Sequence, residues 1–172
     1  MTQELIDLRS SILEGRYDDA LLLVDELEGM SKQAILRNIE SFLVRMLVHL
    51  IKNQLEERLT NSWVASIADS ILQIKKLNLK DNKTSHYLKI DEWELFLEEA
   101  IEAAIAPASV EVLNGRFNPI QVSERVDRAL LILASQKLLN LTYQHSTKEL
   151  PAVINRYLAE LSGGHEWYKG SK

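Results

Sequence analysis

The chain has 172 residues, a formal net charge of −5, 46% hydrophobic and 26% charged residues, and no cysteine. This length and composition predict one globular domain over residues 1–172. The missing cysteine excludes disulfides, thiolate metal sites and cysteine nucleophiles. No apolar run approaches the roughly 20 residues that cross a bilayer. The N-terminal residues also lack the basic start and apolar core of a signal peptide, so we expect a cytoplasmic protein with no membrane segment.

The charge is distributed unevenly along the chain. The local balance is −6 over residues 1–30, +5 over residues 31–90, −6 over residues 91–120 and +2 over the remainder. Such blocks are typical of solvated helix faces that complement each other within a fold, although an acidic partner for the basic block is an alternative. The overall acidity argues against a nucleic-acid binder, which normally presents a strongly basic face.

Hydrophobic residues recur at helical spacing through most of the chain, and short β-branched alternation is missing. The sequence therefore predicts an all-α fold, a single bundle of six or seven helices. The longest and most apolar helix is expected to be central, together with the sixth. The expected helices cover residues of about 3–14, 19–30, 31–59, 63–77, 91–113, 119–139 and 147–162.

Local signals set the expected ends of these helices. Gly15 and Gly29 are natural stops for the first two helices. Pro107 is expected to kink or interrupt the fifth helix. The pair Asn118-Pro119 combines an N-cap with proline at the first helical position. Residues 165–172 are expected to be a frayed tail.

Trp63 follows a polar break at the start of the fourth expected helix. We expect Ser62 to cap this helix while Trp63 packs beside the end of the third helix. This interpretation makes Trp63 the residue that fixes the two helices together. The alternative is that its ring is a platform for a base or another ligand.

Four short motifs lie between Leu8 and about Leu113. They are E-L-E-G-M-S-K at Glu26–Lys32, I-E-S at Ile39–Ser41, L-V-H-L-I-K at Leu47–Lys52 and N-S-W at Asn61–Trp63. Together these motifs, which include Lys52, resemble a bacterial family that is abundant in cyanobacteria and known as domain of unknown function twenty-nine. The resemblance implies an all-α bundle without an assigned activity.

His49 is the titratable residue of greatest interest, because it lies on the long helix at the edge between apolar and polar faces. It is either a general base or metal ligand, or a border histidine that donates one ring hydrogen bond. The Glu-x-x-His pattern of di-iron bundles is absent, since Met46 occupies the position three before His49. We expect no cofactor and no metal, although a carboxylate-only magnesium site on the fifth helix is an alternative.

An acidic stripe on the fifth helix consists of Glu94, Glu98 and Glu102, which recur every four residues. Like charges at this spacing disfavour a helix by roughly 0.2–0.5 kcal/mol each, so a partner is expected. Our hypothesis is that lysines of the basic block lie over the stripe. These lysines are Lys75, Lys76, Lys80 and Lys83. The alternatives are an open stripe that serves a basic partner and a simply solvated face.

Two classes of function remain at this point. The sequence favours a non-enzymatic module that binds a protein partner or itself, including a regulatory or antitoxin-like protein. The alternative is a hydrolase or nucleotide-handling enzyme built on carboxylates of the fifth helix and His49. A helix-turn-helix over residues 129–161 is a further alternative, but its connecting gap is long and its second helix carries few cations.

Overall fold

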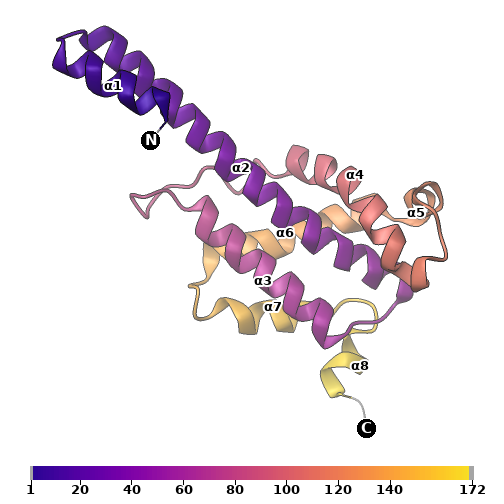
Figure 1. The fold of residues 1–172 in the computed structure, drawn as a ribbon. Coiled ribbons are helices and arrows are strands. Elements are labelled where there is room, and N and C mark those ends of the chain that lie inside the picture. The colour runs from indigo at the N-terminus through magenta and orange to yellow at the C-terminus, as the bar shows by residue number, and fades with distance from the viewer. Residues whose placement is uncertain (1, 171–172) are drawn as a thin grey trace. The chain divides into compact units, whose positions relative to one another are not determined.

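The computed structural model describes residues 2–170, and it is helical apart from turns and an isolated β-bridge between Leu79 and His86 (Figure 1). The prediction of an all-α fold is confirmed, with eight α-helices over the described residues where six or seven were expected. The elements are α1 (Gln3–Leu13), α2 (Tyr17–Glu56), α3 (Asn61–Asn78), α4 (Glu94–Glu111), the 3-10 helix η1 (Val112–Gly115), α5 (Pro119–Arg125), α6 (Arg128–Gln144), α7 (Leu150–Leu158) and α8 (Gly164–Lys169).

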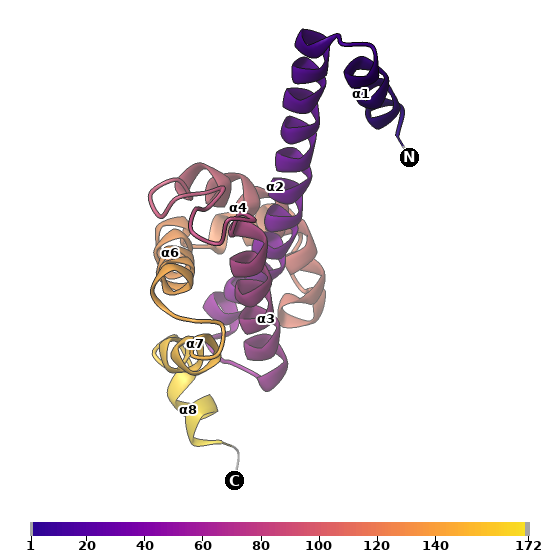
Figure 2. The same ribbon diagram turned by 90° about the vertical axis from the view of Figure 1, so that its left-hand side faces the viewer.

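The chain divides into two compact units, residues 1–38 and residues 39–172, and helix α2 contributes to both. In the first unit, α1 folds back beside the N-terminal part of α2 and runs antiparallel to it (Figure 2). Gly15 permits this turn because it adopts φ 75°, a left-handed conformation that suits glycine. Whether the two units form the single domain expected from the length stays a prediction.

The second unit holds the hydrophobic core. Residues 39–56 of α2 supply the apolar stripe that the sequence predicts, since Ile39, Leu43, Met46, Leu47 and Ile51 are all 0% exposed. Helix α3 adds Ile67, Ile71 and Ile74, which are also fully buried. Helix α6 packs against α3, α4 and α7, as expected for a central helix.

A buried polar network closes the connection between α3 and α4. The Asn78 amide donates to the Leu88 carbonyl at 2.9 Å and accepts from the Leu88 backbone N–H at 2.7 Å. Tyr143 of α6 donates its hydroxyl proton to the same carbonyl at 2.6 Å and accepts from Trp93 Nε1 at 2.7 Å. These bonds satisfy groups that would be costly to bury unpaired, and they fix the loop against α6.

The expected break between the second and third helices is wrong, because α2 is continuous from Tyr17 to Glu56. Gly29 lies inside the helix and has open space around its α-carbon. A single glycine costs a helix only about 0.5–1 kcal/mol relative to alanine, which strong flanking helix formers overcome. Glycine ends a helix only where the chain needs a left-handed residue, and no such residue is needed here.

Pro107 lies inside α4 without interrupting it, and a kink at this residue stays a prediction. Two further boundaries differ from expectation. The helix expected over residues 119–139 is two helices, α5 and α6, because Val126 is extended and Asp127 caps the second by accepting from the Leu130 N–H. Asn118 forms the expected cap, as part of a capping box. The expected frayed tail is helical over Gly164–Lys169, and its last two residues lie outside the described part of the chain.

Two glycines should respond in opposite ways to alanine. Gly163 has φ 72°, and an added Cβ would lie 2.5 Å from both the Arg58 Cα and the Glu57 carbonyl oxygen. Gly163→Ala should therefore lower the free energy of unfolding by about 2–4 kcal/mol. Gly29→Ala should raise it by about 0.5–1 kcal/mol, because the helix there has room for the methyl group. Urea unfolding followed by circular dichroism measures both, and equal effects would contradict the assigned backbone conformations.

Candidate functional site

The chain passes from α2 into α3 through residues 57–60, beside the residues that the sequence singled out. Glu57 adopts a left-handed φ of 52°, which turns the chain out of α2. The hydroxyl of Thr60 accepts a hydrogen bond from the Trp63 backbone N–H at 3.1 Å. The cap of α3 is therefore Thr60, and the expectation that Ser62 caps this helix is wrong. Ser62 is exposed in the first turn of α3.

Trp63 is buried, with 6% of its surface exposed, and two cations lie over its ring. The Lys52 ammonium nitrogen is 4.7 Å from the ring centroid, and the Arg58 guanidinium carbon is 4.6 Å from it. Such cation–π contacts stabilise by roughly 0.5–2 kcal/mol, most strongly where the cation is shielded from water. The arrangement supports the interpretation of Trp63 as the residue that joins α2 and α3. A ligand stacking on this ring would have to displace the protein's own cations.

Lys52 carries a charge into the protein interior. Its side chain is 8% exposed, and its ammonium nitrogen lies 3.3 Å from Oε1 of Glu111 at the end of α4. A buried ammonium is costly unless it is paired, and here both a carboxylate and an aromatic ring compensate it. Lys52 thus links α2, α3 and α4 through one side chain.

Glu56 holds a left-handed turn at the end of α4. Its Oε1 accepts from Arg58 at 3.0 Å, and its Oε2 accepts from the Leu113 backbone N–H at 3.1 Å. Leu113 and Asn114 have φ values of 48° and 59°, which are unfavourable for side chains with a Cβ. The Glu56 carboxylate is only 9% exposed and stabilises this turn. Sequence reasoning did not identify Glu56, Arg58 or Glu111 as parts of this corner.

Asn53 is the second group at this corner that sequence reasoning missed. Its buried amide donates to the Arg58 carbonyl at 3.0 Å and to the Ser162 carbonyl at 2.7 Å. A signal for it exists in the sequence, because Asn53 continues the heptad stripe of Ile39, Leu43, Met46 and Leu50. A polar residue in such a stripe points inward and must find partners there.

His49 lies one turn before Lys52 on α2 and is mainly neutral at pH 7. The pKa of its ring is lowered from 6.5 to about 4. Burial is the largest cause of this shift, and the nearby positive charge of Lys52 is the second. Its Nδ1 atom is enclosed and forms no hydrogen bond with residues 2–170. The expectation that this border histidine donates one ring hydrogen bond is therefore not met at Nδ1. A base with a pKa this low is poorly matched to proton transfer near neutral pH.

The acidic stripe of α4 is exposed, and its ion pairing differs from our hypothesis. Glu102 forms an ion pair with Arg128, the first residue of α6. Lys75 instead donates to the Thr142 carbonyl at 2.6 Å, and Lys80 lies over the Tyr87 ring. Over residues 2–170, none of the four lysines, Lys75, Lys76, Lys80 and Lys83, forms an ion pair with the stripe. The cation that pairs with the stripe within the described residues is therefore Arg128 and none of these four lysines, while Glu94 and Glu98 are exposed.

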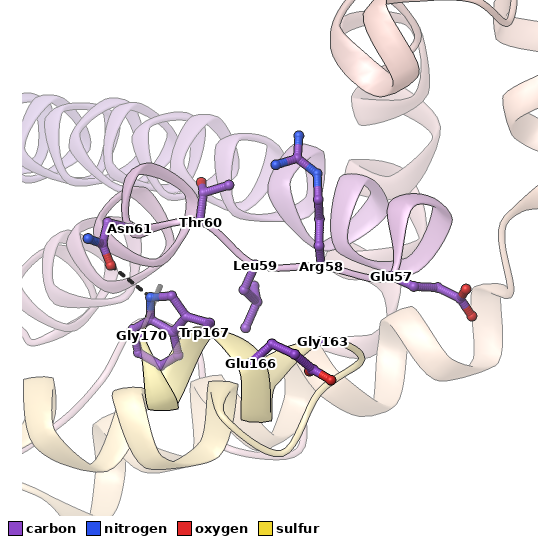
Figure 3. A pocket seen from close by; sticks show the side chains of 9 residues that line it. All are labelled: Glu57, Arg58, Leu59, Thr60, Asn61, Gly163, Glu166, Trp167 and Gly170. Atoms are coloured by element: carbon purple, nitrogen blue, oxygen red, sulfur yellow. Dashed lines mark hydrogen bonds between the residues drawn. The ribbon is translucent and has the colours of Figure 1, made fainter. Parts of the chain in front are cut away.

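A cavity of about 470 Å³ opens between the α2–α3 corner and α8 (Figure 3). Trp167 donates from Nε1 to the Asn61 amide oxygen at 2.8 Å, and the Arg58 side chain points away from the Trp167 ring (Figure 3). The Arg58 guanidinium is already engaged by Glu56 and by Trp63. Of the polar side chains around this cavity, Asn61 and Trp167 bond to each other, and Arg58 and Thr60 are engaged by residues outside its lining. The lining consists of Glu57, Arg58, Leu59, Thr60, Asn61, Gly163, Glu166, Trp167 and Gly170.

The described residues provide neither a metal-binding group of side chains nor a helix that could span a membrane. Between residues 2 and 170, no three histidine, aspartate or glutamate side chains are grouped so that they could hold a metal ion. No helix in that range combines the length and apolar character that a membrane span requires.

The hairpin of α1 and the N-terminal part of α2 exposes hydrophobic side chains on one face. Among residues 2–38, only Ser11 and Ala20 are buried, and they mark the sides on which the two helices meet. Ile12 follows Ser11 by one position, and Leu21 follows Ala20 by one position. Each step turns the side chain by about 100° around its helix. Because the helices are antiparallel, this step leads to the same face of the hairpin in both. We define this apolar face by Leu5 (41% exposed), Ile12 (51%), Tyr17 (65%) and Leu21 (63%). Ile6 and Leu13 are also exposed, but they lie about 100° farther around α1.

The opposite face of the hairpin is acidic. One step back from Ser11 and Ala20 lie Ser10 and Asp19, which line a groove of about 370 Å³. Asp7 and Glu26 line the same groove, while Arg16 is ion-paired with Glu14 and Asp19. Leu22 and Leu23 also line this groove, so its walls carry hydrophobic as well as charged side chains.

Replacement of Trp63 tests the corner between α2 and α3. Trp63→Ala should lower the free energy of unfolding by about 3–5 kcal/mol, because it leaves a cavity and two cations without their ring. Tyr168→Ala is the control, since Tyr168 is 72% exposed and its removal should cost less than about 0.5 kcal/mol. Urea unfolding measures both. A loss below about 1 kcal/mol for Trp63→Ala would show that the corner does not depend on the indole.

His49 should make stability depend on acid pH. Between its unfolded pKa of 6.5 and its folded pKa of about 4, the unfolded chain binds a proton that the folded chain does not. The stability that His49 contributes is therefore complete above pH 6.5 and is lost as the pH falls toward 4. We expect a loss of about 1–2 kcal/mol after allowance for solvent screening. Urea unfolding at pH 7.5 and pH 4.5 should show a smaller loss in His49→Gln than in the unsubstituted chain.

The family comparison places most of this architecture in a known group. Residues 14–118 match the family described as Domain of unknown function DUF29. This range spans α2, α3, α4 and η1, and it includes the four motifs named above. No curated protein and no solved structure matches the chain. Because the family match covers more than half of its residues, the chain belongs to the DUF29 family.

Proposed function

We propose that this protein is a non-enzymatic interaction module, which binds an amphipathic helix of a protein partner on the apolar face of its N-terminal hairpin. The single observation that carries the proposal is the exposure of four large hydrophobic side chains on one face of residues 3–21. A pair of short helices with almost no buried residues gains little from its own packing. An exposed, contiguous apolar surface of this kind is typical of a protein-binding site.

The size of the apolar face fits a helix as its occupant. The four side chains, each about half exposed, amount to an apolar surface on the order of a few hundred Å². Stable protein interfaces bury about 800 Å² on each partner, with an apolar centre and a polar rim. A groove between two antiparallel helices accepts a third helix whose anchors are spaced three and four residues apart.

Features of the second unit agree with a non-enzymatic role. The pKa of His49 is about 4, and the carboxylates of the acidic stripe are exposed to water. Glu111, not a member of the stripe, is the α4 carboxylate whose charge acts on His49. A regulatory or antitoxin-like activity in the cytoplasm is the form of partner binding that we propose.

Uncharged substitutions on the hairpin test this function. A labelled 20-residue peptide, with leucine at helical spacing and lysine on its polar side, should bind the full chain in a fluorescence anisotropy titration. Ile12→Gln with Leu21→Gln should weaken binding at least about 30-fold, because each side chain contributes about 1.5–3 kcal/mol when buried. The matched control is Leu95→Gln with Val110→Gln, which removes exposed hydrophobic groups from α4 (64% and 74% exposed) and should leave binding unchanged.

Circular dichroism on the same variants should show unaltered helicity, since all four side chains are exposed. Equal peptide binding by the hairpin double variant and by the unsubstituted chain would contradict the proposed function.

A further inference from the structure

We infer that the helix which binds the apolar face is basic, with lysine or arginine along the flank that lies over α2. This inference rests on the proposed function and adds the chemistry of the partner. It follows from three carboxylates at the edge of the apolar face, Asp18, Asp25 and Glu28, which lie on the same side of α2 as Leu21.

The helical spacing places these carboxylates beside the apolar face. Asp18 precedes Leu21 by three positions, Asp25 follows it by four, and Glu28 follows it by seven. Residues at these separations are neighbours on one side of an α-helix. All three are exposed, and none forms an ion pair with a residue of the described range 2–170. They form an unpaired acidic edge that runs along the apolar face.

The hairpin carries few cations near this edge. Lys32 follows Glu28 by four positions, but it forms no ion pair with it within residues 2–170. Residues 1–30 hold eight acidic and two basic residues, a balance of −6. Arg16 is already ion-paired with Glu14 and Asp19, which leaves Arg9 as the other cation of these residues. A partner with positive charge on its flank would pair with Asp18, Asp25 and Glu28, and attraction over a Debye length of about 8 Å would also speed its association.

The same charge argues against two other occupants. A second copy of the chain would bring its own acidic hairpin, and like-charged surfaces facing each other oppose association. An anionic lipid surface would be repelled in the same way, since interfacial helices use lysine and arginine beside their apolar face. A basic amphipathic helix is the occupant that satisfies both the hydrophobic side chains and the carboxylates.

Three peptides that share one leucine pattern test the inference on the full chain. Their polar positions carry lysine, glutamine or glutamate, and binding is measured by fluorescence anisotropy. The lysine peptide should bind at least about 10-fold more tightly than the glutamine peptide, and the glutamate peptide should bind most weakly. Raising the sodium chloride concentration from about 50 to about 500 mM should weaken binding of the lysine peptide and leave that of the glutamine peptide nearly unchanged.

Charge reversal shows where the preference originates. The triple variant Asp18→Lys, Asp25→Lys, Glu28→Lys should lose the preference for lysine and bind the glutamate peptide more tightly than the lysine peptide. The matched control Glu94→Lys, Glu98→Lys, Glu99→Lys makes the same change in net charge on α4 and should retain the original order. If the control variant also lost the preference, the effect would come from the overall charge of the chain and the inference would be wrong.

The outcomes separate the inference from the proposed function. Equal binding of the lysine and glutamine peptides, still lost in the variant Ile12→Gln with Leu21→Gln, would overturn the inference and leave the function standing. Binding of none of the peptides would overturn both. Light scattering of the full chain should find a monomer, and a dimer that the Ile12→Gln, Leu21→Gln variant dissociates would identify a second copy as the occupant and overturn the inference.

Discussion

The buried amide of Asn53 connects segments that are far apart in the sequence. Its two donor hydrogens reach the Arg58 carbonyl, in the turn before α3, and the Ser162 carbonyl, just before α8. This pairing brings the chain around Gly163 against the backbone of Arg58, so closely that a Cβ would not fit. The Trp63 ring, with its two cations, then fixes α3 against the end of α2. The second unit depends on this one corner for the relative placement of its first and last helices.

The two units treat their polar and apolar groups differently. In the second unit, charges that enter the interior are compensated there, as Lys52 is by Glu111 and Trp63. In the first unit, eight large hydrophobic side chains of residues 2–38 and the three carboxylates of the acidic edge face solvent. A unit whose interactions are already satisfied has little to offer a partner, whereas an unsatisfied surface gains free energy on binding. The distribution of unsatisfied groups, more than any single residue, directs the functional proposal to the hairpin.

Much of the fold could be predicted from the sequence, because hydrophobic spacing directly reflects which side of a helix is buried. The stripe of Ile39, Leu43 and Met46 and the cap at Asn118 belong to this class. The continuity of α2 could not, since the effect of Gly29 depends on backbone conformation rather than on residue type. The partner of Glu102 could not either: Arg128 is 26 residues away, and only the packing of α6 beside α4 brings the two charges together.

The candidate site was predicted in part. His49, Lys52 and Trp63 do lie together, because their spacing places them near the end of one helix and the start of the next. The sequence did not predict that hydrophobic side chains of α1 are exposed. Their exposure follows from the absence of a hydrophobic core in residues 2–38. That absence also governs spectroscopy, since the three tryptophans, Trp63, Trp93 and Trp167, all belong to the second unit. Intrinsic tryptophan emission will report the melting of the core and remain silent while the hairpin frays.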